Sequence, residues 1–407
     1  MNHVRKLKSN SQKRWKIKRW HTISAVYIVL LVISYLVRLV HPIQIQVAVD
    51  QKTVTLGQSS STDPFHRNIK IAYMDTDPNA TDKDPVILLL HGSPVAARKT
   101  FHNLIPALTQ TGRVIAPDLP GFGASTQKIP DYSIAAHGAY VLRFLQHIGI
   151  EKVHVVAYSM GGGVALNLAH MSPKHVRSMT LLSAIGVQEF ELLGNYHINH
   201  ALHGIQLASI WLLKNGLPHM GLLDKVPIGL SYARNFFDTD QRPLRAYLTE
   251  FEAPLLILHG RRDALIPVTA AQEHFRIVPQ SELKLYDDGH LMVFNQTQRV
   301  ADDIGYFIQR VETARTKSLE AAETNGPKNS PFPCLFLATR SRGNASSVKR
   351  IKAYFRDSFK LILYLGRCFF MRVSSRIRAS NSVSVIINSA PLICCTSFSV
   401  FVSTPFF

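Results

Sequence analysis

The stretch AYSMGGG at residues 157–163 decides the fold, because it directly follows the strand-like run KVHVV and opens a helix-like run. A residue at the tip of such a strand-to-helix turn is exposed and strained, and small residues are needed two positions before and after it. Ala157 and Gly161 occupy those positions. Ser159 is therefore a candidate nucleophile, and the amide of Met160 can donate to an oxyanion at the helix start. The alternative is an ordinary strand-to-helix turn without chemistry.

Strand-like and helix-like runs alternate on both sides of this turn, which is typical of a mainly parallel, doubly wound sheet. Two early strands without a helix between them indicate an antiparallel edge. The strands are expected at 43–49, 68–74, 86–90, 113–117, 152–158, 178–183, 254–259 and 282–287, and the helices at 101–109, 134–148, 160–170, 270–277 and 297–310. A strand-free insertion at about 186–250 is expected at the carboxyl ends of the strands, where such sheets bind ligands.

Two further loops carry candidate site residues. HGSP (91–94) follows the third expected strand, where the backbone amide of Ser93 can face a developing oxyanion. His91 in the same loop could be a catalytic base, but a histidine that braces the loop is the favoured interpretation. With 18 histidines in the chain, most must be bystanders.

The last candidates follow the two final strands. Asp263 lies just past PLLILH and His290 just past ELKLYD, so both are expected at the same sheet edge as Ser159. His290 would remove the serine proton, and Asp263 would orient the imidazole and stabilise its charged form. Asp287 and Asp288 are alternative acids, disfavoured because they lie so close to His290 in sequence.

Over about residues 66–312, the sequence resembles the α/β-hydrolase fold superfamily, in its esterase- and lipase-like group. The resemblance rests on motifs in family-like order and spacing: HGSP (91–94), DLPGFGAS (118–125), AYSMGG (157–162), GRRD (260–263) and DGH (288–290). It implies an eight-stranded, mostly parallel sheet with helices on both faces and a helical lid at about 186–250. It also implies a Ser159–Asp263–His290 triad, an oxyanion hole from the amides of Ser93 and Met160, and a purely structural turn at Asp118.

The expected reaction is two-step acyl transfer to water on an ester-type small molecule, with no metal or organic cofactor. HGSP also resembles epoxide hydrolases and haloalkane dehalogenases, but those relatives use an Asp nucleophile. Carbon–carbon bond hydrolases and haloperoxidase-like members keep a serine triad and stay open, as does a non-catalytic binding module. Apolar residues of the insertion either contact a hydrophobic acyl group or pack the lid on the sheet: Ile205, Leu207, Ile210, Trp211, Leu212 and Leu213.

The formal charge of +19 is concentrated at the two ends of the chain. Residues 1–20 contain eight Lys and Arg and no acid, and residues 315–407 contain 14 against three acids. The middle has 24 bases and 24 acids. A basic nucleic-acid-binding fold is therefore excluded as the simple interpretation, and no nucleic acid partner is expected.

The N-terminus is typical of a membrane anchor. Residues 21–37 carry no formal charge and are rich in Val, Ile and Leu, and snorkelling of Arg38 extends the span to Val40. Positive charge favours the cytoplasmic side, so the hydrolase domain is expected on the outer, periplasmic or lumenal, side. A cleaved signal peptide or a buried helix are the alternatives. The basic and aromatic flank consists of Lys13, Arg14, Trp15, Lys16, Lys18, Arg19 and Trp20.

The expected organisation is thus a basic segment at 1–20, an anchor at 21–40, the hydrolase domain at 41–314, and a linker and tail at 315–407. Residues 315–330 are polar, and the chain from Ala379 onward has no charge. The tail could contact membrane lipid as a second inserted segment. The alternative is a poorly folded extension or an out-of-frame translation, because all four cysteines fall beyond residue 333.

Overall fold

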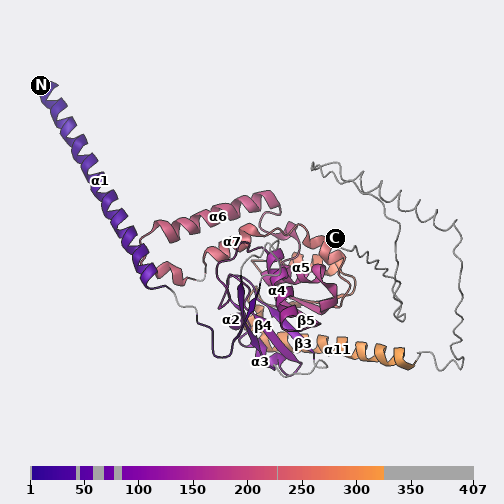
Figure 1. The fold of residues 1–407 in the computed structure, drawn as a ribbon. Coiled ribbons are helices and arrows are strands. Elements are labelled where there is room, and N and C mark those ends of the chain that lie inside the picture. Colours follow the sequence, from indigo (N-terminus) through magenta and orange to yellow (C-terminus); the bar gives the residue numbers. More distant parts are fainter. Residues whose placement is uncertain (1, 43–45, 58–67, 78–84, 227, 325–407) are drawn as a thin grey trace, which may run out of the picture. The chain divides into compact units, whose positions relative to one another are not determined.

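The computed structural model describes residues 2–42, 46–57, 68–77, 85–226 and 228–324 of the 407-residue chain. The predicted tail therefore lies outside the described residues from position 325 onward. Between these limits, one large sheet with helices on both faces organises the chain (Figure 1).

The sheet has eight strands, which confirms the predicted eight-stranded, mostly parallel architecture. Their spatial order is β1-β2-β4-β3-β5-β6-β7-β8. Strand β2 pairs antiparallel with both β1 and β4, and every other pair is parallel. The bounds are β1 (Lys52–Leu56), β2 (Ile69–Asp75), β3 (Val86–Leu90), β4 (Arg113–Pro117), β5 (Val153–Tyr158), β6 (Val176–Leu182), β7 (Leu255–Gly260) and β8 (Ser281–Tyr286).

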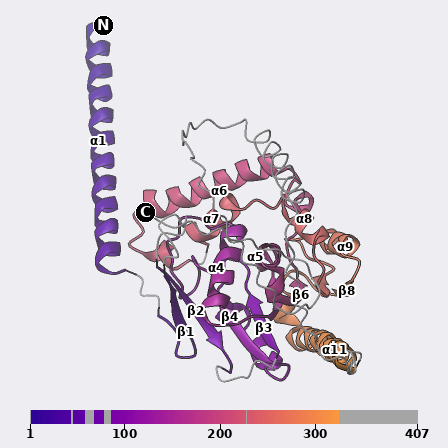
Figure 2. The same cartoon turned by 45° about the vertical axis from the view of Figure 1, so that its right-hand side comes forward.

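Helices cover the two faces of the sheet and form two hydrophobic cores (Figure 2). One core includes residues of α4, α5, α8 and α9, and the other includes residues of α2, α3, α10 and α11. Every residue of β5 is buried, as expected of a parallel strand with both faces covered. The bounds are α1 (Asn2–Val40), α2 (Ala97–Thr100), α3 (Leu104–Leu108), α4 (Ile134–His147), α5 (Met160–Met171), α6 (Tyr196–Gly216), α7 (Leu230–Asp238), α8 (Leu244–Thr249), α9 (Val268–Ile277), α10 (Met292–Asn295) and α11 (Thr297–Thr324).

The first predicted strand is wrong in position. The first strand was expected at 43–49, but residues 46–49 are not a strand, residues 43–45 are not described, and β1 lies at Lys52–Leu56. Its partly exposed edge position explains the weak apolar pattern of KTVTL. The polar stretch that begins at 315 is helical up to Thr324, where α11 ends.

The N-terminal basic and apolar segments form one continuous helix, α1. Its part Arg19–Val40 has 22 residues and a mean hydropathy of 2.4. By length and composition, this part is suited to cross a membrane. The segment between β6 and β7 contains α6, α7 and α8, and its described residues include no strand.

Candidate active site

Four loops at one edge of the sheet carry the predicted site residues. Ser159 follows β5, Ser93 lies in the loop after β3, Asp263 follows β7 and His290 follows β8. These strands run parallel, so their carboxyl ends meet at the same edge. All four residues come from segments far apart in sequence, and the sheet brings them together.

The backbone at Ser159 has φ 55° and ψ −120°, a conformation that non-glycine residues rarely adopt. The Ser159 carbonyl accepts hydrogen bonds from the amides of Gly162 (3.0 Å) and Ile185 (3.2 Å). The Ser159 amide donates to the carbonyl of Leu182 at 3.0 Å. These bonds hold the strained turn and keep the side chain at the edge of the sheet.

Glycine is required two residues after Ser159, because a Cβ at Gly161 would lie 2.3 Å from the carbonyl oxygen of Leu90. We expect Gly161→Ala to destabilise the protein by about 3 kcal/mol, since backbone on both sides cannot move apart cheaply. Its thermal midpoint should fall by roughly 10 °C in a circular dichroism melt. The control is Gly57→Ala, where a Cβ would meet nothing within 4 Å. Equal midpoints for the two variants would contradict the packing of the turn.

The side chains of Ser159, His290 and Asp263 form a continuous hydrogen-bonded chain. The Ser159 hydroxyl donates to Nε2 of His290 at 3.1 Å, and Nδ1 of His290 donates to Oδ2 of Asp263 at 2.8 Å. The His290 side chain is 10% exposed and that of Asp263 is fully buried. Such a chain can pass the serine proton to the imidazole and stabilise the charge that develops there.

The Asp263 carboxylate is held by more than His290. Its Oδ1 accepts from the amides of Leu265 and Ile266, both at 2.9 Å. Burial acts to raise the pKa of Asp263, but the hydrogen bond from His290, the two amide bonds and the nearby imidazole charge outweigh burial and lower it. His259 supports the same turn, because its Nε2 donates to the carbonyl of Ile266 at 2.9 Å.

The other sequence candidates lie in supporting positions. His91 is buried, where its Nδ1 donates to the carbonyl of Gly92 (2.8 Å) and its Nε2 accepts from the amide of Leu119 (2.9 Å). It therefore braces the loop, as favoured above. Asp288 accepts from the amide of Gly289 at 2.7 Å, and the side chain of Asp287 is 83% exposed. Neither acid is bonded to His290 in the described structure.

The predicted structural turn after β4 is centred on Asp118, which is buried. Its Oδ1 accepts from the amide of Ala97 and its Oδ2 from the amide of Ala124, both at 2.9 Å. The carboxylate thus ties the start of α2 to the GFGAS turn. Among the hydrogen bonds of the described residues, none joins Asp118 to Ser159.

The amides of Ser93 and Met160 have no acceptor among the hydrogen bonds of the described residues. Both residues line the cavity that also contains Ser159. Free backbone amides beside a nucleophile can stabilise an oxyanion. Met160 is the first residue of α5, so the helix dipole adds to the stabilisation of negative charge at its amide.

A cavity of about 680 Å³ opens over Ser159 and His290. Most of its lining is apolar, and it includes Phe190, Leu202 and Phe236. In the sequence, six apolar residues of the insertion were expected to contact the substrate or to pack on the sheet. As a group they neither line the cavity nor are buried. Ile205, Leu207, Ile210, Trp211, Leu212 and Leu213 are absent from the lining, and most are strongly exposed. The cavity face of α6 is instead formed by Leu202, His203 and Gln206.

Sequence reasoning missed three cavity residues. The Tyr158 hydroxyl donates to the carbonyl of His290 at 3.1 Å, and its ring centre lies 5.2 Å from the imidazole. Burial and the Asp263 charge raise the pKa of Tyr158, so it remains a neutral donor. Its position beside Ser159 in AYSMGG was the available signal. Glu191 and His203 face each other at 3.2 Å, which only the folded insertion reveals.

Glu191 is an ionised group in a mainly apolar cavity. Its burial acts to raise the pKa, but hydrogen bonds from His203, Gln188 and Asn199 lower it overall. In the described parts of the chain, no group of three His, Cys, Asp or Glu side chains is placed to hold a metal ion.

Residues 85–202 match the family described as the alpha/beta hydrolase fold. An uncharacterized protein of Mycobacterium tuberculosis is 30% identical over 265 residues, which cover 56% of this chain and 77% of that protein. A 2-hydroxy-6-oxo-2,4-heptadienoate hydrolase of Pseudomonas putida is 26% identical over 248 residues, covering 52% of this chain and 84% of the hydrolase.

A solved structure of a thermophilic esterase from Thermogutta terrifontis is similar, with a TM-score of 0.51 and 21% identity. The similarity covers 64% of this chain and 99% of the esterase. A hydrolase from Pseudomonas aeruginosa gives a TM-score of 0.51 at 20% identity, over 63% of this chain and 98% of that one. At this identity, these structures bear on the fold alone.

Proposed function

This chain belongs to the α/β-hydrolase family, and we propose that it is a membrane-anchored serine hydrolase that cleaves an ester with a hydrophobic acyl group. The observation that carries the proposal is the hydrogen-bonded chain from Ser159 through His290 to Asp263, in which Ser159 and His290 line an apolar cavity. Relatives that are named hydrolases, such as the Pseudomonas putida dienoate hydrolase, support a hydrolytic reaction.

In the proposed mechanism, Ser159 Oγ attacks the ester carbonyl while His290 Nε2 takes its proton. The amides of Ser93 and Met160 stabilise the negative oxygen of the tetrahedral intermediate. His290 then gives its proton to the leaving alkoxide, which departs as an alcohol and leaves Ser159 acylated. Water, deprotonated by His290, attacks the acyl carbonyl and releases the acid.

The lining of the cavity favours a neutral, apolar substrate. Among the described residues that line it there is no Lys or Arg, and the Glu191 carboxylate would repel an anion. A second candidate is carbon–carbon bond hydrolysis, favoured by the names of two relatives, the dienoate hydrolase above and a 2-hydroxymuconate semialdehyde hydrolase from a Pseudomonas strain. An anionic dienoate would lack a cationic partner in this cavity.

We further propose that Arg19–Val40 anchors the chain, with the N-terminus cytoplasmic and the hydrolase domain on the outer side. Support comes from the apolar 22-residue stretch and from the bases directly before it, such as Lys16 and Lys18. Membrane lipid is therefore a proposed partner.

The test is hydrolysis of p-nitrophenyl esters of increasing acyl length, with a 2-hydroxy-6-oxo-2,4-dienoate as the competing substrate. We expect kcat/KM to rise by up to about fourfold per added methylene until the cavity is filled, because each buried methylene contributes about 0.8 kcal/mol. The dienoate should be turned over far more slowly. Faster dienoate turnover would favour the second candidate. A folded protein inactive on both substrates would favour a binding module.

A further inference from the structure

Helix α6 presents different residues to the cavity and to the outside. Leu202, His203 and Gln206 line the cavity. Large apolar side chains of α6 and of the segment after it form what we call the outer α6 surface. They are Ile205 (65% exposed), Trp211 (56%), Leu212 (60%), Leu213 (51%), Leu217 (46%) and Leu222 (71%). Large exposed apolar surfaces are typical of interaction sites.

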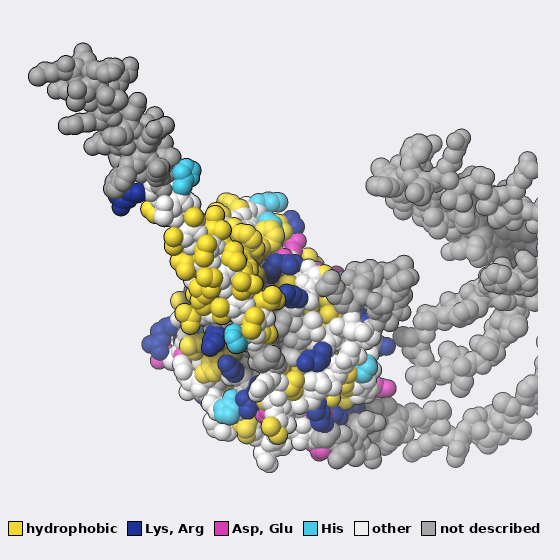
Figure 3. Space-filling view, turned by 60° about the vertical axis from the view of Figure 1, so that its left-hand side comes forward, with side chains coloured by type: hydrophobic (Ala, Val, Ile, Leu, Met, Phe, Trp, Pro, Cys, Tyr) yellow, Lys and Arg dark blue, Asp and Glu magenta, His cyan; other side chains and the backbone are white. Residues whose placement is uncertain are grey.

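The end of this surface is bonded to the apolar half of α1. The Ser34 hydroxyl accepts from the amide of Met220 at 2.9 Å, and the Tyr35 hydroxyl donates to the carbonyl of Asn215 at 3.0 Å. Figure 3 shows hydrophobic side chains gathered where α1 reaches the rest of the described chain. The outer α6 surface is therefore continuous with the proposed membrane span.

The polar side chains of the span explain this contact. Between Tyr27 and Val40 only four side chains are polar, and each is bonded to residues 214–224. The Ser34 side chain is 1% exposed, although most of the residues next to it in sequence are exposed. A polar group among lipid tails needs a partner from protein, because no water is present there. The segment after α6 supplies these partners.

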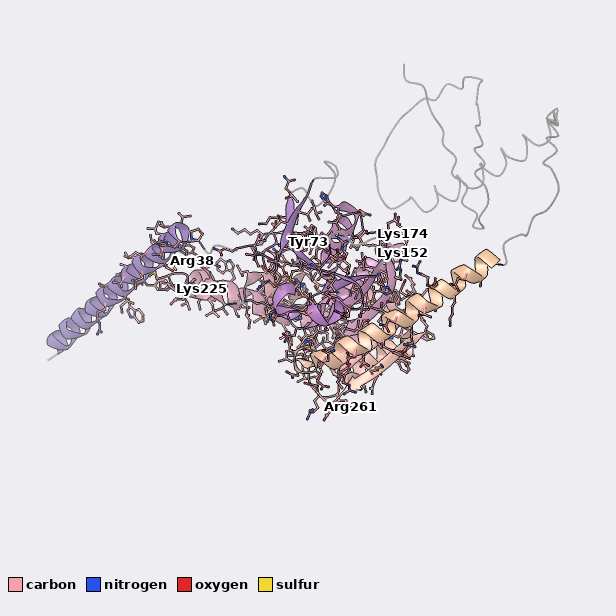
Figure 4. The ribbon with its side chains drawn as sticks, turned by 90° about the horizontal axis from the view of Figure 1, so that it is seen from below. Arg38, Tyr73, Lys152, Lys174, Lys225 and Arg261 are labelled. Atoms are coloured by element: carbon pink, nitrogen blue, oxygen red, sulfur yellow. The ribbon has the colours of Figure 1, made fainter. Side chains whose placement is uncertain are left out.

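The position of Arg38 shows how far from the Val40 end of α1 the contact lies. Its Nε and Nη2 donate to the two carboxylate oxygens of Asp224 at 2.7 and 3.0 Å. At 1.5 Å per residue, Arg38 lies about 3 Å and Ser34 about 9 Å along α1 from Val40. Lys225 is exposed and lies near Arg38 (Figure 4). A lysine at this position can extend its ammonium group to lipid headgroups.

We propose that the outer α6 surface inserts among the lipid acyl chains of the same leaflet as the Val40 end of α1. The helix that covers the cavity is then a membrane-inserted element, and the site faces substrates dissolved in that leaflet. This inference rests on the proposed anchor. The occupant is the bilayer, because the surface adjoins a segment that itself has the length and composition of a span.

Trp211 provides a direct probe. The chain has three tryptophans, so Trp15→Phe with Trp20→Phe leaves Trp211 as the sole reporter. The full chain is reconstituted in phosphatidylcholine vesicles with and without bromine on the acyl chains. We expect brominated lipid to quench Trp211 emission by more than half, and aqueous iodide to leave it unchanged.

The matched control moves the reporter to α9. Phe275 is 46% exposed, so Phe275→Trp in a background with all three native tryptophans changed to Phe gives a similarly open probe. This reporter should respond to iodide and not to brominated lipid. Both measurements need no turnover, so an inactive protein would overturn the proposed reaction without touching this inference.

Three results would overturn the inference. Iodide quenching of Trp211 without quenching by brominated lipid would place α6 in water. Protection from both quenchers would mean that protein, such as a second copy of the chain, covers the surface. Release of the chain from membranes by alkaline carbonate would contradict the proposed anchor itself. If the protein resists carbonate, either of the first two results would contradict only the insertion of α6.

Discussion

Replacing Ser159 by Ala is expected to lower kcat for ester hydrolysis on the order of 100,000-fold, with the protein still folded. The physical reason is that the variant lacks the atom that forms the acyl intermediate, so only the oxyanion amides and substrate binding remain. Because the substitution leaves the backbone unchanged, the strained turn at 159 should persist as it is, and the thermal midpoint should not fall. The measurement is steady-state hydrolysis of the best p-nitrophenyl ester, with circular dichroism as the folding check.

Ser183→Ala is the matched control for this variant. Ser183 follows β6 at the same edge of the sheet, and its buried hydroxyl has no hydrogen-bond partner among the described residues. It does not line the cavity. We expect its kcat to remain within about threefold of wild type. Similar losses in both variants would indicate a structural effect rather than loss of a nucleophile.

Asp263→Asn is expected to lower kcat on the order of 10,000-fold, with a much smaller effect on KM. The amide keeps the shape of the buried side chain but removes the negative charge beside His290. It can also present a donor to Nδ1, which would place the imidazole proton on Nε2 and block it as a base. Steady-state kinetics on the same ester measure this effect.

The control is Asp287→Asn, because Asp287 was an alternative acid in the sequence and its side chain is 83% exposed. Its activity should stay within about twofold of wild type. A large loss there, with an active Asp263→Asn protein, would reverse the assignment of the acid.

The lowered pKa of Asp263 also predicts how stability depends on pH. A carboxyl group whose pKa is lower in the folded state stabilises the protein above its unfolded pKa, and this effect is lost as pH falls through the folded pKa. The free energy of unfolding of wild type should therefore exceed that of Asp263→Asn by the largest amount near pH 7. The difference should shrink in strongly acidic solution.

Much of the sheet could be predicted from local patterns. Strands β3 and β4 have the bounds that VILLL and RVIAP predicted, because buried parallel strands need continuous apolar runs. The candidate site residues could be placed at one edge of the sheet by a single rule, that parallel strands end at the same edge. Edge strand β1 was not predicted, because a half-exposed strand has no continuous apolar run. The alternating pattern of IQIQVAV is typical of a strand and was therefore predicted as one.

The insertion shows where sequence reasoning fails. Helix α6 is apolar on more than one side, so periodicity cannot tell its cavity face from its outer face. The residues expected inside, such as Ile205 and Leu212, lie outside. The contact of Glu191 with His203 depends on the fold of this segment, as does the bonding of Ser34 to Met220. None of these pairs follows from spacing alone.

The most direct test of the account is labelling of the full chain in detergent with a fluorophosphonate, followed by peptide mapping by mass spectrometry. An activated serine attacks the phosphorus, expels fluoride and stays covalently modified. The account predicts a single modified peptide that carries the label on Ser159, no labelling of Ser159→Ala, and slow labelling of His290→Ala. A folded protein that stays unlabelled, or that carries the label on another residue, would contradict it.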